Sequence, residues 1–302
     1  MAILWVPITL TAAASQSVRT ALQRHLKGPL STNGAAFTRF VFGVPLAALY
    51  LTALLAAGVG QLPAPGPGFW FWVLFGSLSQ ILATSLQIYV MAARNFATGV
   101  AYGKTEVVQA AIFEILFLGA TVTWLGACGI AIGTVAVMIM SLRGNRPVQA
   151  FVEGLGDPTS LVGLAAGGLL GLAAVGFRGA SVSLEHPSAF VAAAFTLVVS
   201  TAVQTLVLGS YLALREPGEL GRVVANARTG SLVGFTSCLG SASWFTAFTL
   251  QIAAYVRTLG LVELAFTLLI SRYAFREHPR RTELIGLGLL AVGIVMVLNG
   301  GR

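Results

Sequence analysis

The chain has 302 residues, of which 56% are hydrophobic and only 9% are charged. A soluble domain of this length could not keep so much apolar surface from water, because about a quarter of the residues in ordinary soluble domains are charged. The net charge of +8 does not indicate a nucleic-acid partner, because the basic residues lie in short loops between apolar runs. The composition therefore predicts a protein whose solvent is the lipid bilayer.

About ten apolar runs follow one another along the chain, each near the roughly 20 residues that a helix needs to cross a bilayer. Inside a bilayer, only helices and closed barrels satisfy their own backbone hydrogen bonds, and runs this long favour helices. We therefore predict an all-α integral membrane fold of about ten transmembrane helices. The predicted spans are 3–22, 34–57, 69–91, 97–118, 122–141, 160–178, 189–212, 230–250, 253–272 and 283–299.

The second half of the chain repeats the first in the order of its polar positions, at an offset of 157 residues. Gly103 and Glu106 begin one apolar run, and Gly260 and Glu263 begin its counterpart. This pattern predicts two five-helix inverted repeats joined by the longest connection. Their expected limits are 1–142 for the first repeat, 143–158 for the connecting loop and 159–302 for the second repeat.

The distribution of Lys and Arg predicts the orientation of the chain. Twelve of these residues fall in connections on one side and two, Arg178 and Arg302, on the other. Because basic connections stay in the cytoplasm, we expect both termini outside, in a plasma membrane of the bacterial inner-membrane type. The twelve are Arg24, Lys27, Arg94, Arg143, Arg146, Arg215, Arg222, Arg228, Arg272, Arg276, Arg280 and Arg281.

Glu106 and Glu263 are the strongest candidates for function. A charged side chain near the centre of a transmembrane helix costs at least about 2.5–3.5 kcal/mol, so such residues face a cavity or a partner. Our hypothesis is that one or both carboxylates bind a proton or a cationic group of a substrate. The alternative is an ion pair with the neighbouring Lys104 or Arg257, although neither spacing is the favourable three or four. Glu114, two turns beyond Glu106, is expected in the same interior or at the far interface.

Polar residues on two helices, and one arginine, are predicted to line a substrate cavity. On the first helix they repeat at spacings that place them on one face, and their counterparts lie on a second helix. Hydrogen bonding between helices is the alternative role for these residues. Arg39, five residues inside its span, is a candidate for attracting an anionic group. The polar set comprises Gln80, Thr84, Gln87, Ser237, Ser241, Trp244 and Gln251.

Other chemistry finds little support in the sequence. The two cysteines, Cys128 and Cys238, lie far apart in apolar runs, and the three histidines lie singly at segment ends. We therefore expect no metal site, no cofactor and no enzymatic nucleophile. No nucleotide-binding motif GxxxxGK[ST] occurs, so direct use of ATP is not expected. GxxxG spacings such as Gly129–Gly133 indicate close helix contact within the chain or in a homodimer, and both interpretations stay open.

The chain resembles the drug/metabolite transporter superfamily, and in particular its EamA-type members. The resemblance is carried by ELAFTLLISRYAFREHPRRTELIGLGLLAVGIVMVL, with Glu277 at the loop Glu and Gly286 and Gly293 at the helix glycines. Glu106 and Glu263 stand where many relatives have a Pro that kinks the helix. Relatives generally have both termini in the cytoplasm, which differs from the orientation predicted here.

The resemblance implies a secondary transporter that moves a small metabolite or drug-like compound by alternating access between the repeats. Proton coupling would then involve the carboxylates. A lipid-carrier flippase of the same fold is the alternative, and an intramembrane enzyme is a weaker one.

Overall fold

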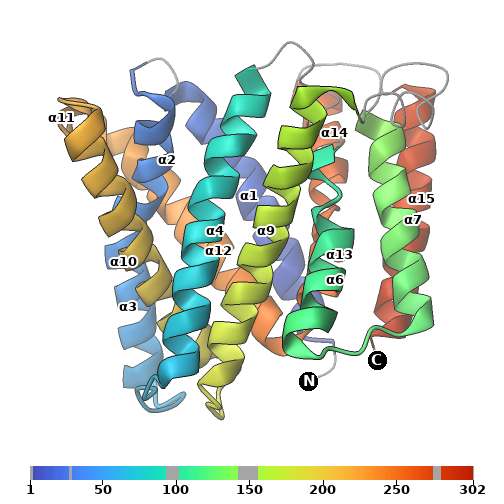
Figure 1. Cartoon of the computed structure of the whole chain (residues 1–302), viewed down its shortest axis with the longest axis horizontal. Helices are drawn as coiled ribbons and strands as arrows, with labels where there is room; N and C mark the ends of the chain where they lie inside the picture. Colours follow the sequence, from blue (N-terminus) through green and yellow to red (C-terminus); the bar gives the residue numbers. More distant parts are fainter. Residues whose placement is uncertain (1–2, 27–28, 93–101, 142–155, 275–279, 302) are drawn as a thin grey trace. The chain divides into compact units, whose positions relative to one another are not determined.

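The structure is a computed structural model that describes residues 3–26, 29–92, 102–141, 156–274 and 280–301. Within these ranges every regular element is a helix and no strand occurs (Figure 1). The helices are α1 (Trp5–Leu26), α2 (Thr32–Val41), α3 (Gly43–Ala56), α4 (Pro67–Ala92), α6 (Glu106–Leu118), α7 (Trp124–Ser141), α9 (Pro158–Ser183), α10 (Ala189–Arg215), α11 (Glu219–Ala225), α12 (Ala227–Leu250), α13 (Ala253–Gly260), α14 (Glu263–Ala274) and α15 (Arg281–Gly300).

Six helical stretches in the described residues are long and apolar enough to cross a membrane. They are Thr32–Ala56, Pro67–Gln87, Trp124–Ser141, Pro158–Ser183, Ala189–Arg215 and Arg281–Gly300. An all-α, multi-pass membrane protein is therefore the fold class. The other four predicted spans fall on α1, α6, α12 and the pair α13–α14, and they stay predictions as membrane crossings.

Several local sequence signals determine where these helices begin and end. Pro67 and Pro158 are the first residues of α4 and α9, a position where the missing N–H of proline costs nothing. Ser31 caps α2 by accepting the N–H of Gly34 at 3.0 Å. α11 was not predicted; it begins after Gly218, whose left-handed φ of 83° turns the chain.

The chain forms two compact units, and each draws on both halves of the sequence. Unit 1 contains Leu82–Val175 and Gln251–Arg302, and unit 2 contains Ile3–Ile81 and Gly176–Leu250. α4 and α9 therefore contribute to both units. Positions 143–155 of the predicted connection 143–158, which include Arg143 and Arg146, lie outside the described residues. Other predicted positions outside the described residues are Lys27, Arg94, Arg276 and Glu277.

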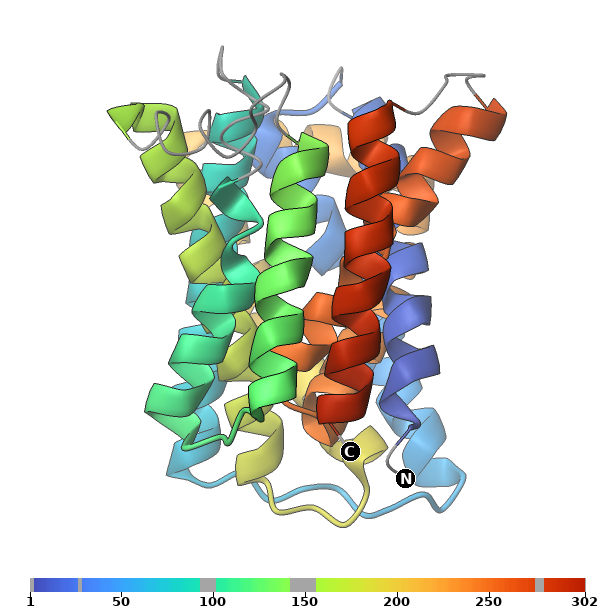
Figure 2. The same ribbon diagram turned by 90° about the vertical axis from the view of Figure 1, so that its right-hand side faces the viewer.

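In unit 1, α7 and α15 pack against each other along their length (Figure 2). A Cβ atom on Gly129 would lie 2.7 Å from the carbonyl oxygen of Gly293, and one on Gly293 would lie 2.8 Å from that of Gly129. Only glycine permits so close an approach of the two backbones. The predicted motif at Gly129 thus serves a contact within the chain, and homodimerisation stays a prediction.

In unit 2, α1 packs along α12, and α10 contacts α2, α3 and α12. α2 and α3 are separated at Phe42, whose atoms fill the space beside two glycines of α12. A Cβ atom on Gly234 would lie 2.8 Å from the backbone carbon of Phe42. The interruption between α2 and α3 is therefore held against α12.

Candidate functional site

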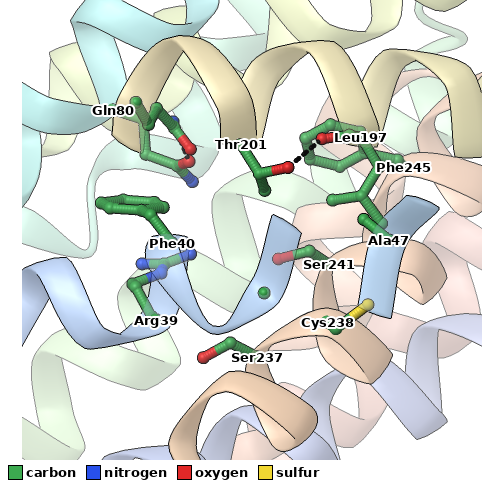
Figure 3. Close-up of a pocket in the computed structure, with 12 residues that line it drawn as sticks. Arg39, Phe40, Ala47, Gln80, Leu197, Thr201, Ser237, Cys238, Ser241 and Phe245 are labelled. Carbon is green, nitrogen blue, oxygen red and sulfur yellow. Dashed lines mark hydrogen bonds between the residues drawn. The ribbon is translucent and has the colours of Figure 1, made fainter. Parts of the chain in front are cut away.

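A small buried cavity in unit 2 gathers polar side chains from four helices (Figure 3). Its polar lining comes from α2, α4, α10 and α12, and α3 contributes Gly43 and Ala47. The cavity volume of about 10 Å³ is close to the minimum that one water molecule needs. The polar lining residues are Arg39, Gln80, Thr201, Gln204, Ser237 and Ser241.

Four of the predicted site residues, Arg39, Gln80, Ser237 and Ser241, meet at this cavity. Arg39 lies in the last turn of α2, one turn before the interruption at Phe42. Its guanidinium lies 4.9 Å from the centre of the Phe40 ring, a distance at which the ring face attracts a cation. The interruption thus places a positive charge beside the cavity.

α10 contributes two polar residues to the cavity that were not predicted from the sequence. Gln204 is 1% exposed and its amide nitrogen donates to the Gln80 side-chain oxygen at 2.7 Å. Thr201 lies one turn earlier and donates to the carbonyl of Leu197 at 2.6 Å. Both are polar residues in the middle of an apolar run, and the cost of burying a polar side chain there is the signal that could have identified them.

Ser237 and Ser241 reach the cavity from α12, but the rest of their predicted stripe does not. The residues of α12 that line the cavity are spaced four apart, so the residue after Ser241 in this lining is Phe245. The indole nitrogen of Trp244 instead donates to Gln16 at 3.2 Å, and its ring stacks on that of Phe248. Trp244 is therefore part of the packing around the site.

Thr84, Gln87 and Gln251 belong to unit 1 and do not line this cavity. The side chain of Gln251 accepts the N–H of Ile252 at 2.9 Å and donates to the carbonyl of Gly301 at 3.0 Å. These bonds support the interpretation of Gln251 as a structural residue that fixes the start of α13.

The two predicted carboxylates lie at equivalent helix interruptions in unit 1. Gly103 is helical, two turn residues follow, and Glu106 begins α6. Gly260 ends α13, two turn residues follow, and Glu263 begins α14. The helix therefore breaks at both places although neither carries proline, and a carboxylate is the first residue after each break.

The carboxylates are paired with cations across the two halves of the sequence. Lys104 forms an ion pair with Glu263, and Arg257 lies 3.8 Å from Glu106. Glu106 and Arg257 are 6% and 9% exposed. The pairs considered from sequence were between neighbours within one half, so the structure corrects the partners while supporting the ion-pair interpretation.

Glu114 has a structural role that the sequence left open. It is fully buried, and its two oxygens accept the N–H groups of Ala253 at 2.9 Å and Ala254 at 3.2 Å. These are the first N–H groups of α13, where a carboxylate satisfies otherwise unpaired donors and the helix dipole. Because Glu106 contacts the other end of α13 through Arg257, α6 binds this short helix at both ends.

No group of three or more His, Cys, Asp or Glu side chains that could hold a metal ion occurs in the part of the chain that the structure describes. Cys128 and Cys238 are both free thiols.

The sequence matches no protein-family model and no curated protein. Among solved structures, 28 chains are similar. One of them, described only as "Crystal structure of protein", has a TM-score of 0.66 at 17% identity and covers 99% of each chain. At this identity the similarity concerns the fold alone.

Proposed function

We propose that the chain is a secondary transporter that moves a small metabolite or drug-like compound across the membrane by alternating access. The observation that carries the proposal is the polar cavity of unit 2. Burying polar side chains among membrane-spanning helices is costly, so such side chains commonly mark a substrate pathway. The cavity has a volume of only about 10 Å³, so a substrate would enter only after the surrounding helices move.

An architecture of two five-helix inverted repeats, as in the EamA-type transporters that the sequence resembles, is part of the proposal. It is supported by the helix interruptions before Glu106 and Glu263, which recur at an offset of 157 residues, and by α7 and α15, which begin at the same offset. Transporters of this kind place substrate and ion sites at interrupted helices.

Proton coupling would run through the crossed ion pairs of unit 1. A carboxylate that takes up a proton loses its attraction for the cation beside it. Protonation of Glu263 would thus release Lys104, and protonation of Glu106 would release Arg257. Because each pair joins one half of the sequence to the other, their release would loosen the contact between the halves.

The test is uptake into proteoliposomes across a panel of metabolites and amines, with and without an imposed pH gradient. We expect the gradient to drive uptake by the native protein, and Glu263→Gln to abolish the gradient dependence. Arg39→Gln should lower uptake, whereas Arg228→Gln, which removes an exposed arginine, should not. Saturable uptake that ignores the gradient would contradict coupling. Absence of saturable uptake for every compound would contradict transport.

A further inference from the structure

A second cavity of unit 2 is apolar and adjoins the polar cavity. It is a groove of about 380 Å³ between α1, α3, α12 and the first turn of α10, a volume in the range of small-molecule sites. Leu49, Phe235 and Leu239 of its lining are 64%, 56% and 44% exposed. The groove therefore opens to the surface of the helices, which in a membrane protein faces the acyl chains of the bilayer.

The wall between the groove and the polar cavity is thin. Cys238 of α12 lines both spaces. On α3, the small residues Gly43 and Ala47 face the polar cavity, while Leu46 and Tyr50 face the groove. Because the cavity side of α3 carries only small residues, a small separation of α3 from α12 would join the two spaces.

The two spaces have complementary chemistry. The groove is lined mainly by hydrocarbon and holds no charged side chain among its described lining residues. The polar cavity contains the Arg39 guanidinium and, among the described residues that line it, no carboxylate. The hydroxyl of Ser237, which is 3% exposed, is buried at the cavity with no hydrogen-bond partner. The cavity thus offers a positive charge and a buried hydroxyl group to an anion.

We propose that the substrate is a single-chain amphiphile with an anionic head, such as a medium-chain carboxylate. Its head binds Arg39 and Ser237 in the polar cavity, and its apolar chain lies in the groove and enters from the bilayer. This inference rests on the proposed function, because it assigns the substrate class of the same cavity.

Cys238 provides a native probe for this binding mode, because it lines both spaces. In a Cys128→Ser background it is the only thiol of the chain. The protein is placed in phosphatidylcholine nanodiscs, and the rate of Cys238 alkylation by N-ethylmaleimide is followed by mass spectrometry. Three ligands are compared: dodecanoate, dodecyltrimethylammonium and acetate. Dodecyltrimethylammonium shares the apolar chain of dodecanoate, and acetate shares its carboxylate head.

We expect dodecanoate to slow alkylation several-fold and the other two ligands to have little effect. Arg39→Gln should weaken protection by dodecanoate about tenfold in concentration, as expected for losing a hydrogen bond to a charged group. Arg228→Gln removes an arginine at the start of the same helix as Cys238 and should leave protection unchanged.

Two results would overturn the inference. Equal protection by the cationic chain, or protection that survives Arg39→Gln, would show that the groove accepts any chain without recognising a head. Protection by acetate would assign the cavity to small anions and leave the groove without a role. If Cys238 does not react even without ligand, equilibrium binding of radiolabelled dodecanoate to the same variants measures whether binding depends on Arg39.

Failure of this inference differs from failure of the proposed function. Uptake of a hydrophilic metabolite without dodecanoate binding would support the transport function and contradict the proposed amphiphilic substrate. Dodecanoate binding that depends on Arg39, together with an absence of saturable uptake for every compound tested, would support the site and contradict transport.

Discussion

The buried charges of unit 1 hold the short helix α13 in place. All eight residues of α13 are buried, so its end groups cannot be hydrated. Glu114 supplies the acceptors at its first turn, and Glu106 pairs with Arg257 in its last turn. The charged residues of α6 therefore compensate for the interruptions on either side of α13.

Removing the Glu114 carboxylate should destabilise the protein. Glu114→Ala leaves the buried N–H groups of Ala253 and Ala254 without this acceptor, at a cost of about 1–3 kcal/mol for each. We expect the thermal midpoint of the purified protein to fall by several degrees, and Glu114→Gln to have a smaller effect. Glu283→Ala is the control, because Glu283 caps α15 at an exposed helix start and should cost only about 1 kcal/mol. Equal losses at both sites would contradict the assigned role.

The buried pair of Glu106 and Arg257 should show strong coupling. Glu106→Gln leaves a buried guanidinium without its carboxylate partner, which costs about 3–5 kcal/mol at such sites. The double variant with Arg257→Gln should cost clearly less than the sum of the single changes. A double-mutant cycle on thermal or denaturant stability measures this difference. Arg228→Gln, at an exposed arginine, should change stability little, and additive effects at 106 and 257 would show that the pair is not formed.

The close approach of helices α7 and α15 depends on particular glycines. Gly293→Ala would place a Cβ atom 2.8 Å from a backbone oxygen of α7, so we expect a loss of about 1–3 kcal/mol from overpacking. Gly288→Ala on the same helix has open space around its Cβ position and should be neutral or slightly stabilising, since alanine favours helices. Thermal midpoints of the two variants are the measurement. An unchanged midpoint for Gly293→Ala would contradict the contact.

The positions of the helices follow from the sequence better than their interruptions and their side-chain partners do. Apolar runs locate the helices, because span length and local breakers determine them. The predicted spans 97–118 and 253–272 ran without a break across Glu106 and Glu263, so neither interruption was predicted from the sequence. The partner of each Glu lies about 150 residues away in the chain, and spacing rules reach only neighbours three or four residues apart. Gln204 and Thr201 were missed because the polar stripes were chosen by their counterparts at the offset of 157, and the positions 157 residues before these two are the apolar Ala47 and Val44.

The distribution of basic residues predicts the orientation of the protein in the membrane. The 57–66 connection and α11 lie at opposite ends of unit 2 (Figure 1). Arg215, Arg222 and Arg228 surround α11, whereas the 57–66 connection contains no Lys or Arg. Because basic connections stay in the cytoplasm, α11 should face the cytoplasm and the 57–66 connection the outside.

Single cysteines at exposed positions near the two ends of unit 2 can establish this orientation. In a background without native cysteines, Ala64→Cys and Gly221→Cys place one thiol at each end of unit 2, both at exposed residues. We expect a membrane-impermeant maleimide to label Ala64→Cys in intact cells, and to label Gly221→Cys only after permeabilisation. The reverse pattern would place the basic connections outside, because each variant serves as the control for access to the other side. A proton gradient that drives uptake would then have to act on the opposite face of the protein, so the labelling result also determines how the transport assay is read.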